Sequence, residues 1–161
     1  MCVCAYLTDR QIPFERFLHP PAPSATRMAQ SMHIPGRRVA KGVLLKADGV
    51  FLLAVLPATH RIDLPRLAAV LVADALGLAT EEEVGRVFHD CERGALPPFG
   101  RLYGLRSVVD ASLAGGAEIV LEGNTRHEGL RMRYRDYESL EAPTRARFAT
   151  AIDPRRRRQA S

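Results

Sequence analysis

The chain has 161 residues, the length of one domain with its own hydrophobic core, and its 47% hydrophobic and 25% charged residues are ordinary for a soluble globular protein. The longest apolar runs, 50–56 and 67–76, are too short to cross a bilayer, so we expect no membrane-spanning segment and no membrane partner. Three cysteines do not suggest a disulfide framework, and the first residues do not resemble a signal peptide, so we expect a cytoplasmic protein.

The net charge of +5 comes mostly from the C-terminus. Arg155 to Arg158 contribute four positive charges, which leaves the rest of the chain near +1. We therefore expect one folded domain over residues 1–152 and a basic, disordered tail over residues 153–161. The alternative for the tail is a contact with a nucleic-acid backbone.

The first half of the chain predicts short elements followed by a β-hairpin. The early elements, in chain order, are a helix over 3–10, a strand over 12–19, and a helix from Ser24 or Thr26 to Met32. Between residues 39 and 57, two β-rich runs are separated by Ala47, Asp48 and Gly49. Because Asp-Gly is a strong hairpin signal, we expect these runs to pair as antiparallel strands.

The second half predicts helices first and then a second hairpin. Asp63 can cap a helix through Leu76, and Thr80 with Glu83 forms a capping box for a helix to Phe88. The remaining elements are a strand over 106–113, a hairpin over 118–134 with Gly123 and Asn124 in its turn, and a helix over 136–141. Hairpins mixed with helices, without regular βαβ alternation, indicate an α+β fold with a mixed, largely antiparallel sheet flanked by helices.

Lys41 is the first candidate for a functional residue. Side chains alternate across a strand, so Val39, Lys41 and Val43 share one face, while Ala40 and Leu44 lie on the other. A lysine among apolar neighbours either packs its stem and extends its amine to water or binds an anionic substrate group. Residue type alone favours the first reading.

The segment GALPPFG, residues 94–100, is the second candidate. Pro97 and Pro98 fix the backbone and remove two donors, while Gly94 and Gly100 permit conformations closed to other residues. The result is a stiff loop whose carbonyl groups, lacking nearby partners, can face a cavity and orient a water molecule. The alternative is a rigid surface connection between a helix and a strand, and composition alone favours it.

The third candidate is His127, at the tip of the second predicted hairpin. A histidine can shuttle a proton near neutral pH, although a single histidine in a turn is more often a solvated surface residue. For a metal, Cys2 with Cys4 and His89 with Cys91 do not match the usual zinc spacings. We expect neither a metal nor a cofactor.

Together the three candidates are more specific than each alone. The order of VAKGVLLKADG (39–49), TEEEVGRVFHDCERGALPPFG (80–100) and SLAGGAEIVLEGNTRHEGLRM (112–132) resembles the YbaK/EbsC family. This family includes the editing domain of bacterial prolyl-tRNA synthetase and free-standing trans-editing aminoacyl-tRNA deacylases. The resemblance runs from about Ile12 to Leu140, and its G-x-x-x-P pattern matches Gly94 to Pro97 and Pro98.

The resemblance implies a role for each candidate. The family's loop lines the pocket for the mischarged amino acid and helps hold the hydrolytic water, which assigns catalysis to Gly94 and substrate binding to the other loop residues, Pro97, Pro98, Phe99 and Gly100. The family's strand lysine, which binds the terminal adenosine of the tRNA and is required for activity, matches Lys41. Its G-x-x-x-H element, which shapes the pocket and limits the size of the substrate, matches Gly123 and His127. The resemblance thus places His127 with Lys41 and Gly94 among the catalytic residues, and Gly123 and Asn124 among the substrate-binding ones.

The resemblance therefore predicts a trans-editing deacylase that removes a small amino acid from a mischarged tRNA, such as tRNA for proline, with a synthetase as a possible partner. Alanine-specific relatives carry asparagine directly after the lysine, whereas this chain has Gly42, and the cysteine-specific subgroup often lacks the histidine found here. The amino acid removed therefore stays open. Two alternatives also stay open: a non-catalytic module that binds tRNA or a small ligand, and a hydrolase of other small esters.

Overall fold

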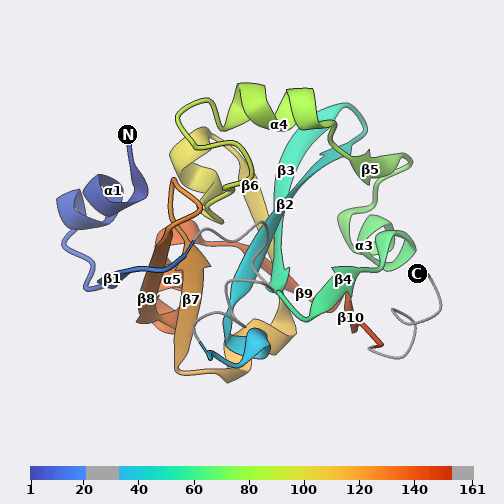
Figure 1. Cartoon of the computed structure of the whole chain (residues 1–161). Coiled ribbons are helices and arrows are strands. Elements are labelled where there is room, and N and C mark those ends of the chain that lie inside the picture. Colours follow the sequence, from blue (N-terminus) through green and yellow to red (C-terminus); the bar gives the residue numbers. More distant parts are fainter. Residues whose placement is uncertain (21–32, 154–161) are drawn as a thin grey trace.

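The structure is a computed structural model that describes residues 1–20 and 33–153 (Figure 1). The predicted helix between Ser24 or Thr26 and Met32 lies outside these residues, as does the predicted tail beyond Asp153.

Helices and strands alternate irregularly along the chain. The α-helices are α1 (Val3–Asp9), α3 (Leu64–Leu71), α4 (Glu81–Val87) and α5 (Tyr134–Glu141). Single turns of 3-10 helix are η1 (Gly36–Arg38), η2 (Gly100–Tyr103) and η3 (Ala111–Gly115). The strands are β1 (Glu15–Leu18), β2 (Ala40–Ala47), β3 (Val50–Pro57), β4 (His60–Ile62), β5 (Leu76–Leu78), β6 (Arg106–Asp110), β7 (Glu118–Glu122), β8 (Glu128–Arg133), β9 (Thr144–Ala146) and β10 (Ala149–Ala151).

The strands form one mixed sheet and two smaller antiparallel ones. The large sheet has the order β5-β2-β3-β6-β9, in which β2 pairs antiparallel with β5 and β3, and β6 pairs parallel with β3 and β9. The second sheet is β1-β8-β7, and β4 pairs with β10. A parallel bridge between Val39 and Val120 links the beginning of β2 to β7. This arrangement confirms the predicted α+β class with a mixed, largely antiparallel sheet.

The β2–β3 hairpin forms where Asp48-Gly49 predicts it. Ala47 pairs with Val50, and both turn residues adopt left-handed backbone angles, with φ of 49° at Asp48 and 84° at Gly49. Such angles match the twist of the two strands and are those of a type I′ turn. In Figure 1, α4 lies across this end of the hairpin, and an ion pair between Lys46 and Glu83 joins the two elements.

The predicted helix caps are present, but one helix is shorter than expected. The Asp63 carboxylate accepts from the Arg66 N–H, and Thr80 and Glu83 form a complete capping box. Helix α3 ends at Leu71 rather than Leu76, because Val72 turns into the left-handed region with φ of 54°. Residues 76–78 instead pair with β2 as strand β5, where the register of the sheet outweighs the helical pattern.

The strand predicted over 106–113 also ends early, at Asp110. The Asp110 carboxylate accepts from the backbone N–H of Ser112, and this side-chain bond starts the 3-10 turn η3. The three-residue strands β4, β5, β9 and β10 were not predicted, because so few residues show no periodicity.

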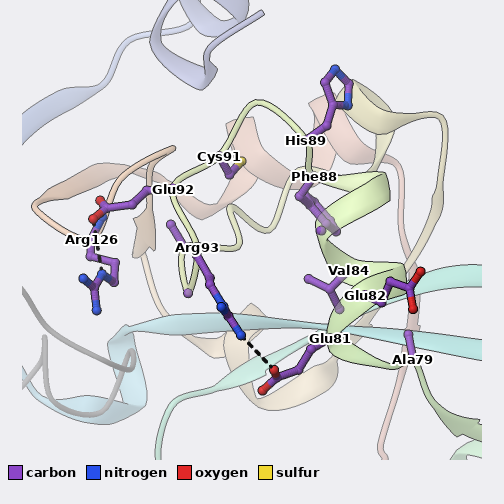
Figure 2. A pocket seen from close by; sticks show the side chains of 13 residues that line it. Ala79, Glu81, Glu82, Val84, Phe88, His89, Cys91, Glu92, Arg93 and Arg126 are labelled. Atoms are coloured by element: carbon purple, nitrogen blue, oxygen red, sulfur yellow. Dashed lines mark hydrogen bonds and ion pairs between the residues drawn. The ribbon is translucent and has the colours of Figure 1, made fainter.

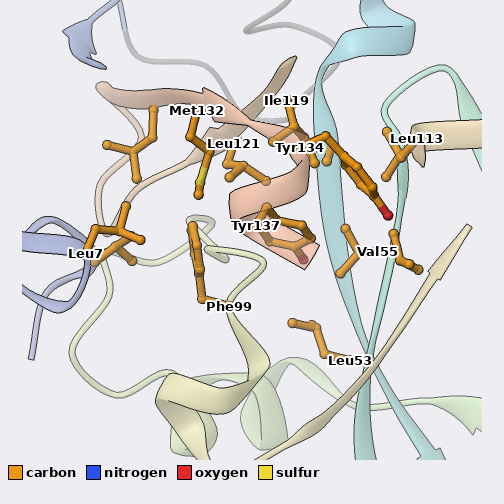
Figure 3. Close-up of a cluster of buried hydrophobic side chains, with 14 of the residues drawn as sticks. Leu7, Leu53, Val55, Phe99, Leu113, Ile119, Leu121, Met132, Tyr134 and Tyr137 are labelled. Carbon is orange, nitrogen blue, oxygen red and sulfur yellow. The ribbon is translucent and has the colours of Figure 1, made fainter. Parts of the chain in front are cut away.

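Apolar clusters cover both faces of β2. Ala40 and Leu44 face the central core, in which Phe99 lies against Tyr137, with Leu53 and Leu121 nearby (Figure 3). At the beginning of β2, the opposite face carries a smaller cluster, whose buried members are Val39, Ala58 and Val120 and whose partly buried members are Phe17 and Ile34. Further along β2, Val43 and Leu45 belong to a third cluster. The predicted alternation along this strand is therefore confirmed.

No helix in the described residues is both long and apolar enough to cross a membrane.

Candidate functional site

Lys41 and Glu122 project from the same face of two neighbouring strands. The bridge between Val39 and Val120 aligns β2 and β7 in parallel, and each charged residue lies two positions beyond its bridging valine. Because side chains alternate along a strand, both side chains share the face of the Val39–Ala58–Val120 cluster. We call this surface, with Lys41, Glu122 and those three apolar residues, the Lys41 face.

The Lys41 side chain is half-buried at the edge of this apolar cluster. Its ammonium group lies 3.5 Å from the carbonyl oxygen of Ala58, which follows the end of β3. The stem therefore packs on apolar side chains while the charged end remains near polar backbone, an arrangement that suits binding of an anion at this edge.

The loop of residues 94–98 packs against the strand position next to Lys41. An added Cβ on Gly42 would come within 2.6 Å of the Leu96 side chain and 3.4 Å of Pro98, so only a glycine permits this close approach. Gly94 adopts a left-handed φ of 92°, which a residue with a Cβ rarely adopts. Gly42 shares the face of Ala40 and Leu44, so the loop packs on the face of β2 opposite to the Lys41 side chain, at the neighbouring position along the strand.

The second half of the loop is held by hydrogen bonds. The Pro97 carbonyl accepts from Phe99 N–H at 2.8 Å, and the Pro98 carbonyl accepts from the buried Tyr137 hydroxyl at 2.7 Å. The expectation of unpartnered carbonyls is therefore wrong for the two prolines. In the described part of the chain, it holds for the carbonyls of Gly94, Ala95 and Leu96, which accept no hydrogen bond.

Phe99 and Gly100 support the loop from inside the core. Phe99 is fully buried and packs edge-on against Tyr6 and Tyr137. Gly100 lies so close to the Ser107 hydroxyl that an added Cβ would overlap it. These two residues do not face the surface, and their contacts hold the end of the loop against the core.

Glu122 is a candidate that the sequence analysis did not select. Its side chain is only 7% exposed, and one carboxylate oxygen accepts from the Leu96 N–H at 3.4 Å. Burial raises the pKa of the Glu122 carboxyl to about 7, and the Leu96 hydrogen bond lowers it only in part. Glu122 therefore connects the loop to the Lys41 face. The one sign of this residue in the sequence is its position directly after the apolar residues of EIVLE, 118–122.

The tip of the β7–β8 hairpin brings His127 to the edge of the small sheet. His127 is exposed, and its carbonyl accepts from the N–H of His19 at 2.8 Å, continuing the β1–β8 register. Gly123, at the other end of the tip, is in contact with the Glu128 side chain, which an added Cβ would overlap. His127 thus lies at the start of β8, and in the order β1-β8-β7-β2 strand β7 stands between it and Lys41.

Asn124 holds the hairpin tip to its surroundings. Its carbonyl side-chain oxygen accepts from Val3 N–H at 2.7 Å, and its amide lies within 3.5 Å of Cys91 Sγ and 3.4 Å of the Tyr103 hydroxyl. The polar atoms of Asn124 are thus engaged inside the protein, and it acts as a structural connection between α1 and the segment after α4.

Comparison with known proteins identifies the family. A profile of the aminoacyl-tRNA editing domain matches residues 19–140, about three quarters of the chain. The chain belongs to the aminoacyl-tRNA editing domain family. This family agrees with the resemblance seen in the sequence. A search of curated proteins gives no significant match.

Solved structures show the same fold at low identity. A "putative trans-editing enzyme for prolyl tRNA synthetase" superposes on this editing domain with a TM-score of 0.81 and 21% identity, covering 92% of this chain and 95% of the other. A protein described as hypothetical gives a TM-score of 0.82 at 16% identity, over 92% and 99% of the two chains. A "putative signal transduction protein" from Marinobacter aquaeolei VT8 gives 0.73 at 24% identity, over 92% of this chain and 30% of the other.

A cavity of about 930 Å³ in the editing domain lies between α4 and the segment 91–95 (Figure 2). Arg93 reaches across it to Glu81, and Arg126 pairs with Glu92 on the opposite wall. Gly94 borders this cavity, whereas Lys41, Glu122 and His127 are not among its lining residues. The loop therefore has one end at the cavity and its middle against β2.

Two of the three cysteines, Cys4 and Cys91, are partly buried thiols. Burial raises the pKa of Cys4 and of Cys91 to about 11, so both remain protonated near neutral pH and are poor nucleophiles. Within residues 1–20 and 33–153, no three side chains of the metal-binding types gather into a possible site.

Proposed function

We propose that this editing domain is a trans-acting deacylase that hydrolyses the ester bond of a mischarged aminoacyl-tRNA. The observation that carries the proposal is that adjacent residues of β2 position both candidates: Lys41 projects from one face, and Gly42 packs under Leu96 and Pro98 on the other. The membership of the editing-domain family supplies the substrate class.

In the proposed reaction, a water molecule attacks the ester carbonyl carbon of the aminoacyl group. The carbonyl oxygen becomes an oxyanion, the bond to the ribose oxygen breaks, and this oxygen takes the proton that the water loses. An ester of this kind is already activated, so positioning the water and stabilising the developing charge can suffice without a protein nucleophile.

Each part of the site has a separate task in this reaction. Lys41 binds the negatively charged 3′ end of the tRNA, at its terminal adenosine. The free carbonyls of Gly94, Ala95 and Leu96 accept hydrogen bonds from the attacking water or from the substrate. Pro97, Pro98, Phe99 and Gly100 hold the backbone of the loop, which keeps these carbonyls in place.

The hairpin tip sets the size of the amino acid in this proposal. His127 and Gly123 limit the side chain that can enter, while Asn124 fixes the tip through its bonds to Val3 and Tyr103. A stiff wall excludes a bulky side chain more strongly than it favours one methyl group, so the substrate is a small amino acid, attached for example to tRNA for proline. The setting is the cytoplasm, with a synthetase as a possible partner.

Deacylation of a panel of charged tRNAs tests the proposal. Ala-, Ser-, Cys-, Thr- and Pro-tRNA are incubated with the full chain, with Lys41→Ala and with Lys46→Ala as the matched control. Lys46 lies on the same strand but pairs with Glu83. We expect hydrolysis of one or two species, lost in Lys41→Ala and retained in Lys46→Ala.

A binding module without catalysis is the second candidate function. The near-neutral charge of the chain outside its arginine tail favours it, because few unbalanced cations are left to hold tRNA in a catalytic complex. Binding of tRNA that survives Lys41→Ala, with no hydrolysis of any charged tRNA, would support this function. Hydrolysis of free amino-acid esters but of no charged tRNA would indicate a small-ester hydrolase.

A further inference from the structure

Glu122 differs from the other buried carboxylates in how its oxygens are satisfied. Asp110 is similarly buried, and it accepts bonds from the N–H groups of Ser112, Phe148 and Ala149 and from the Ser112 hydroxyl. Glu128 accepts from Cys4 Sγ on one oxygen and from Arg16 on the other. Within residues 1–20 and 33–153, Glu122 accepts only the Leu96 N–H, at 3.4 Å. Its side chain thus has capacity for another donor.

The unused oxygen of Glu122 is not sealed inside the protein. Glu141 also has one oxygen without a donor, but that atom is completely enclosed beside Ser107. Among the described residues, Oε1 of Glu122 has no hydrogen-bond donor, and it is not one of the enclosed unpartnered atoms. A poorly satisfied carboxylate that is mostly removed from water and yet reachable is suited to bind a charged donor.

Glu122 and Lys41 lie on one face of neighbouring strands, and their opposite charges match the two ends of an aminoacyl ester. Lys41, from β2, projects from the same face and supplies a positive charge. On the β1 and β8 side are His19 and His127, joined through their backbones. The 96–98 part of the loop brings only the Leu96 N–H to the carboxylate. The 3′ end of a charged tRNA carries phosphates, whereas its amino acid carries an α-ammonium group, whose pKa is about 8 or lower.

We propose that Glu122 binds the α-ammonium group of the esterified amino acid. This inference rests on the proposed deacylase function and names the group that fixes the amino-acid end, while Lys41 holds the tRNA end. An ionised carboxylate and an ammonium group form a charge-assisted hydrogen bond, which is stronger and shorter than one between neutral groups. Because Glu122 also accepts from Leu96, the same carboxylate aligns the ester with the loop.

The experiment compares two esters that differ only at the α position. The best substrate of the panel is prepared as the aminoacyl-tRNA and as its α-hydroxyacyl analogue, in which a hydroxyl replaces the ammonium group. We expect the native chain to prefer the amino ester by about 10- to 100-fold in kcat/KM, as befits a hydrogen bond to a charged group. Glu122→Gln should hydrolyse both esters at similar rates, close to the native rate on the hydroxy ester.

Each other outcome contradicts the inference. An equal loss on both esters in Glu122→Gln would make Glu122 a general base or a structural group instead. An unchanged preference in the variant would remove it from the substrate site. Glu118→Gln is the matched control, because Glu118 lies on the same strand and face but is 55% exposed and paired with Arg131. This control should keep the native preference.

Binding measurements on the native chain alone keep the inference testable if Glu122→Gln does not fold. Adenosine carrying a non-hydrolysable 3′-amide of the amino acid is titrated against the same compound with an α-hydroxyl. Tighter binding of the amino compound by tenfold or more is expected, and equal affinities would overturn the inference. Failure of the native chain to hydrolyse any charged tRNA would overturn the deacylase function instead, and the binding comparison would still decide the role of Glu122.

Discussion

The buried hydroxyl of Tyr137 donates a 2.7 Å hydrogen bond to the carbonyl oxygen of Pro98. This bond ties helix α5 to the loop that packs against β2, across 39 residues of sequence. Since Pro98 can donate no bond of its own, its carbonyl is the one polar backbone group through which this residue can be held. The loop is therefore positioned from the core.

Tyr137→Phe is expected to destabilise the protein by about 1–2 kcal/mol, because it leaves the Pro98 carbonyl without its donor in a buried place. Urea unfolding followed by circular dichroism measures this loss, and deacylation should fall in parallel as the loop loosens. Tyr134→Phe is the control. The Tyr134 hydroxyl is also buried, but no donor or acceptor in the described structure meets it with good hydrogen-bond geometry, and its nearby polar groups, Glu138 and Arg145, already pair with each other, so its removal should cost less. Equal losses in the two variants would contradict the role given to the Tyr137 bond.

Gly42→Ala is expected to move the loop away from β2. The new methyl group would come within 2.6 Å of Leu96 and 3.2 Å of the fully buried Leu53, and overpacking of this kind costs about 1–3 kcal/mol. Leu96 is the more easily displaced of the two, so deacylation should fall more than stability does. Thermal unfolding and kcat/KM on the preferred substrate measure the two effects.

Gly77→Ala provides the comparison for this prediction. Gly77 pairs with Lys46 in the same sheet, and an added Cβ would meet no atom within 4 Å. This variant should retain both stability and activity. Retention of full activity in Gly42→Ala as well would show that the packing of Leu96 and Pro98 on β2 is not needed for the reaction.

Local signals in the sequence predicted the frame of the molecule better than its site. Asp48-Gly49 and the Thr80–Glu83 capping box act over four residues or fewer, so they could be read without knowing the fold. The three-residue strands could not, because β5 exists only through its pairing with β2. The α+β class followed from the mixture of hairpins and helices.

The candidate site was predicted only where short-range signals determine it. Alternation along one strand placed Lys41 opposite Ala40 and Leu44, as the two apolar clusters confirm. Glu122 looked like an ordinary charged residue at a strand end, since its burial arises from the loop arriving from 26 residues away. The ring of Phe99 packs against Tyr137 of α5, and the side-chain oxygen of Asn124 accepts from Val3 of α1. No local sequence pattern reveals either contact.

Glu122 should make the stability of the protein depend on pH. Burial raises the pKa of its carboxyl from 4.5 to about 7 in the folded state. Between these values the folded protein keeps a proton that the unfolded chain has lost, so stability falls as the pH rises from about 4.5 to 7 and then levels off. The expected total is about 3 kcal/mol.

Glu122→Gln isolates this effect, because it lacks the titrating group but keeps the shape. As the pH rises from about 4.5 to 7, the native chain should lose about 3 kcal/mol of unfolding free energy relative to the variant. Urea unfolding at several pH values measures this difference. A difference that stays constant with pH would mean that Glu122 has an ordinary pKa and is ionised throughout.

Removal of residues 154–161 should weaken the association of the protein with tRNA without changing its fold. The four arginines of this segment carry most of the net charge, and each contact with a phosphate releases counterions. If all four contact a single-stranded backbone, the slope of log affinity against log salt should flatten by about 3. Fluorescence anisotropy with labelled tRNA at several salt concentrations measures this slope. Replacing the four arginines by lysine should preserve it, since charge is the property required, and an unchanged slope in the truncated chain would show that the tail does not touch the RNA.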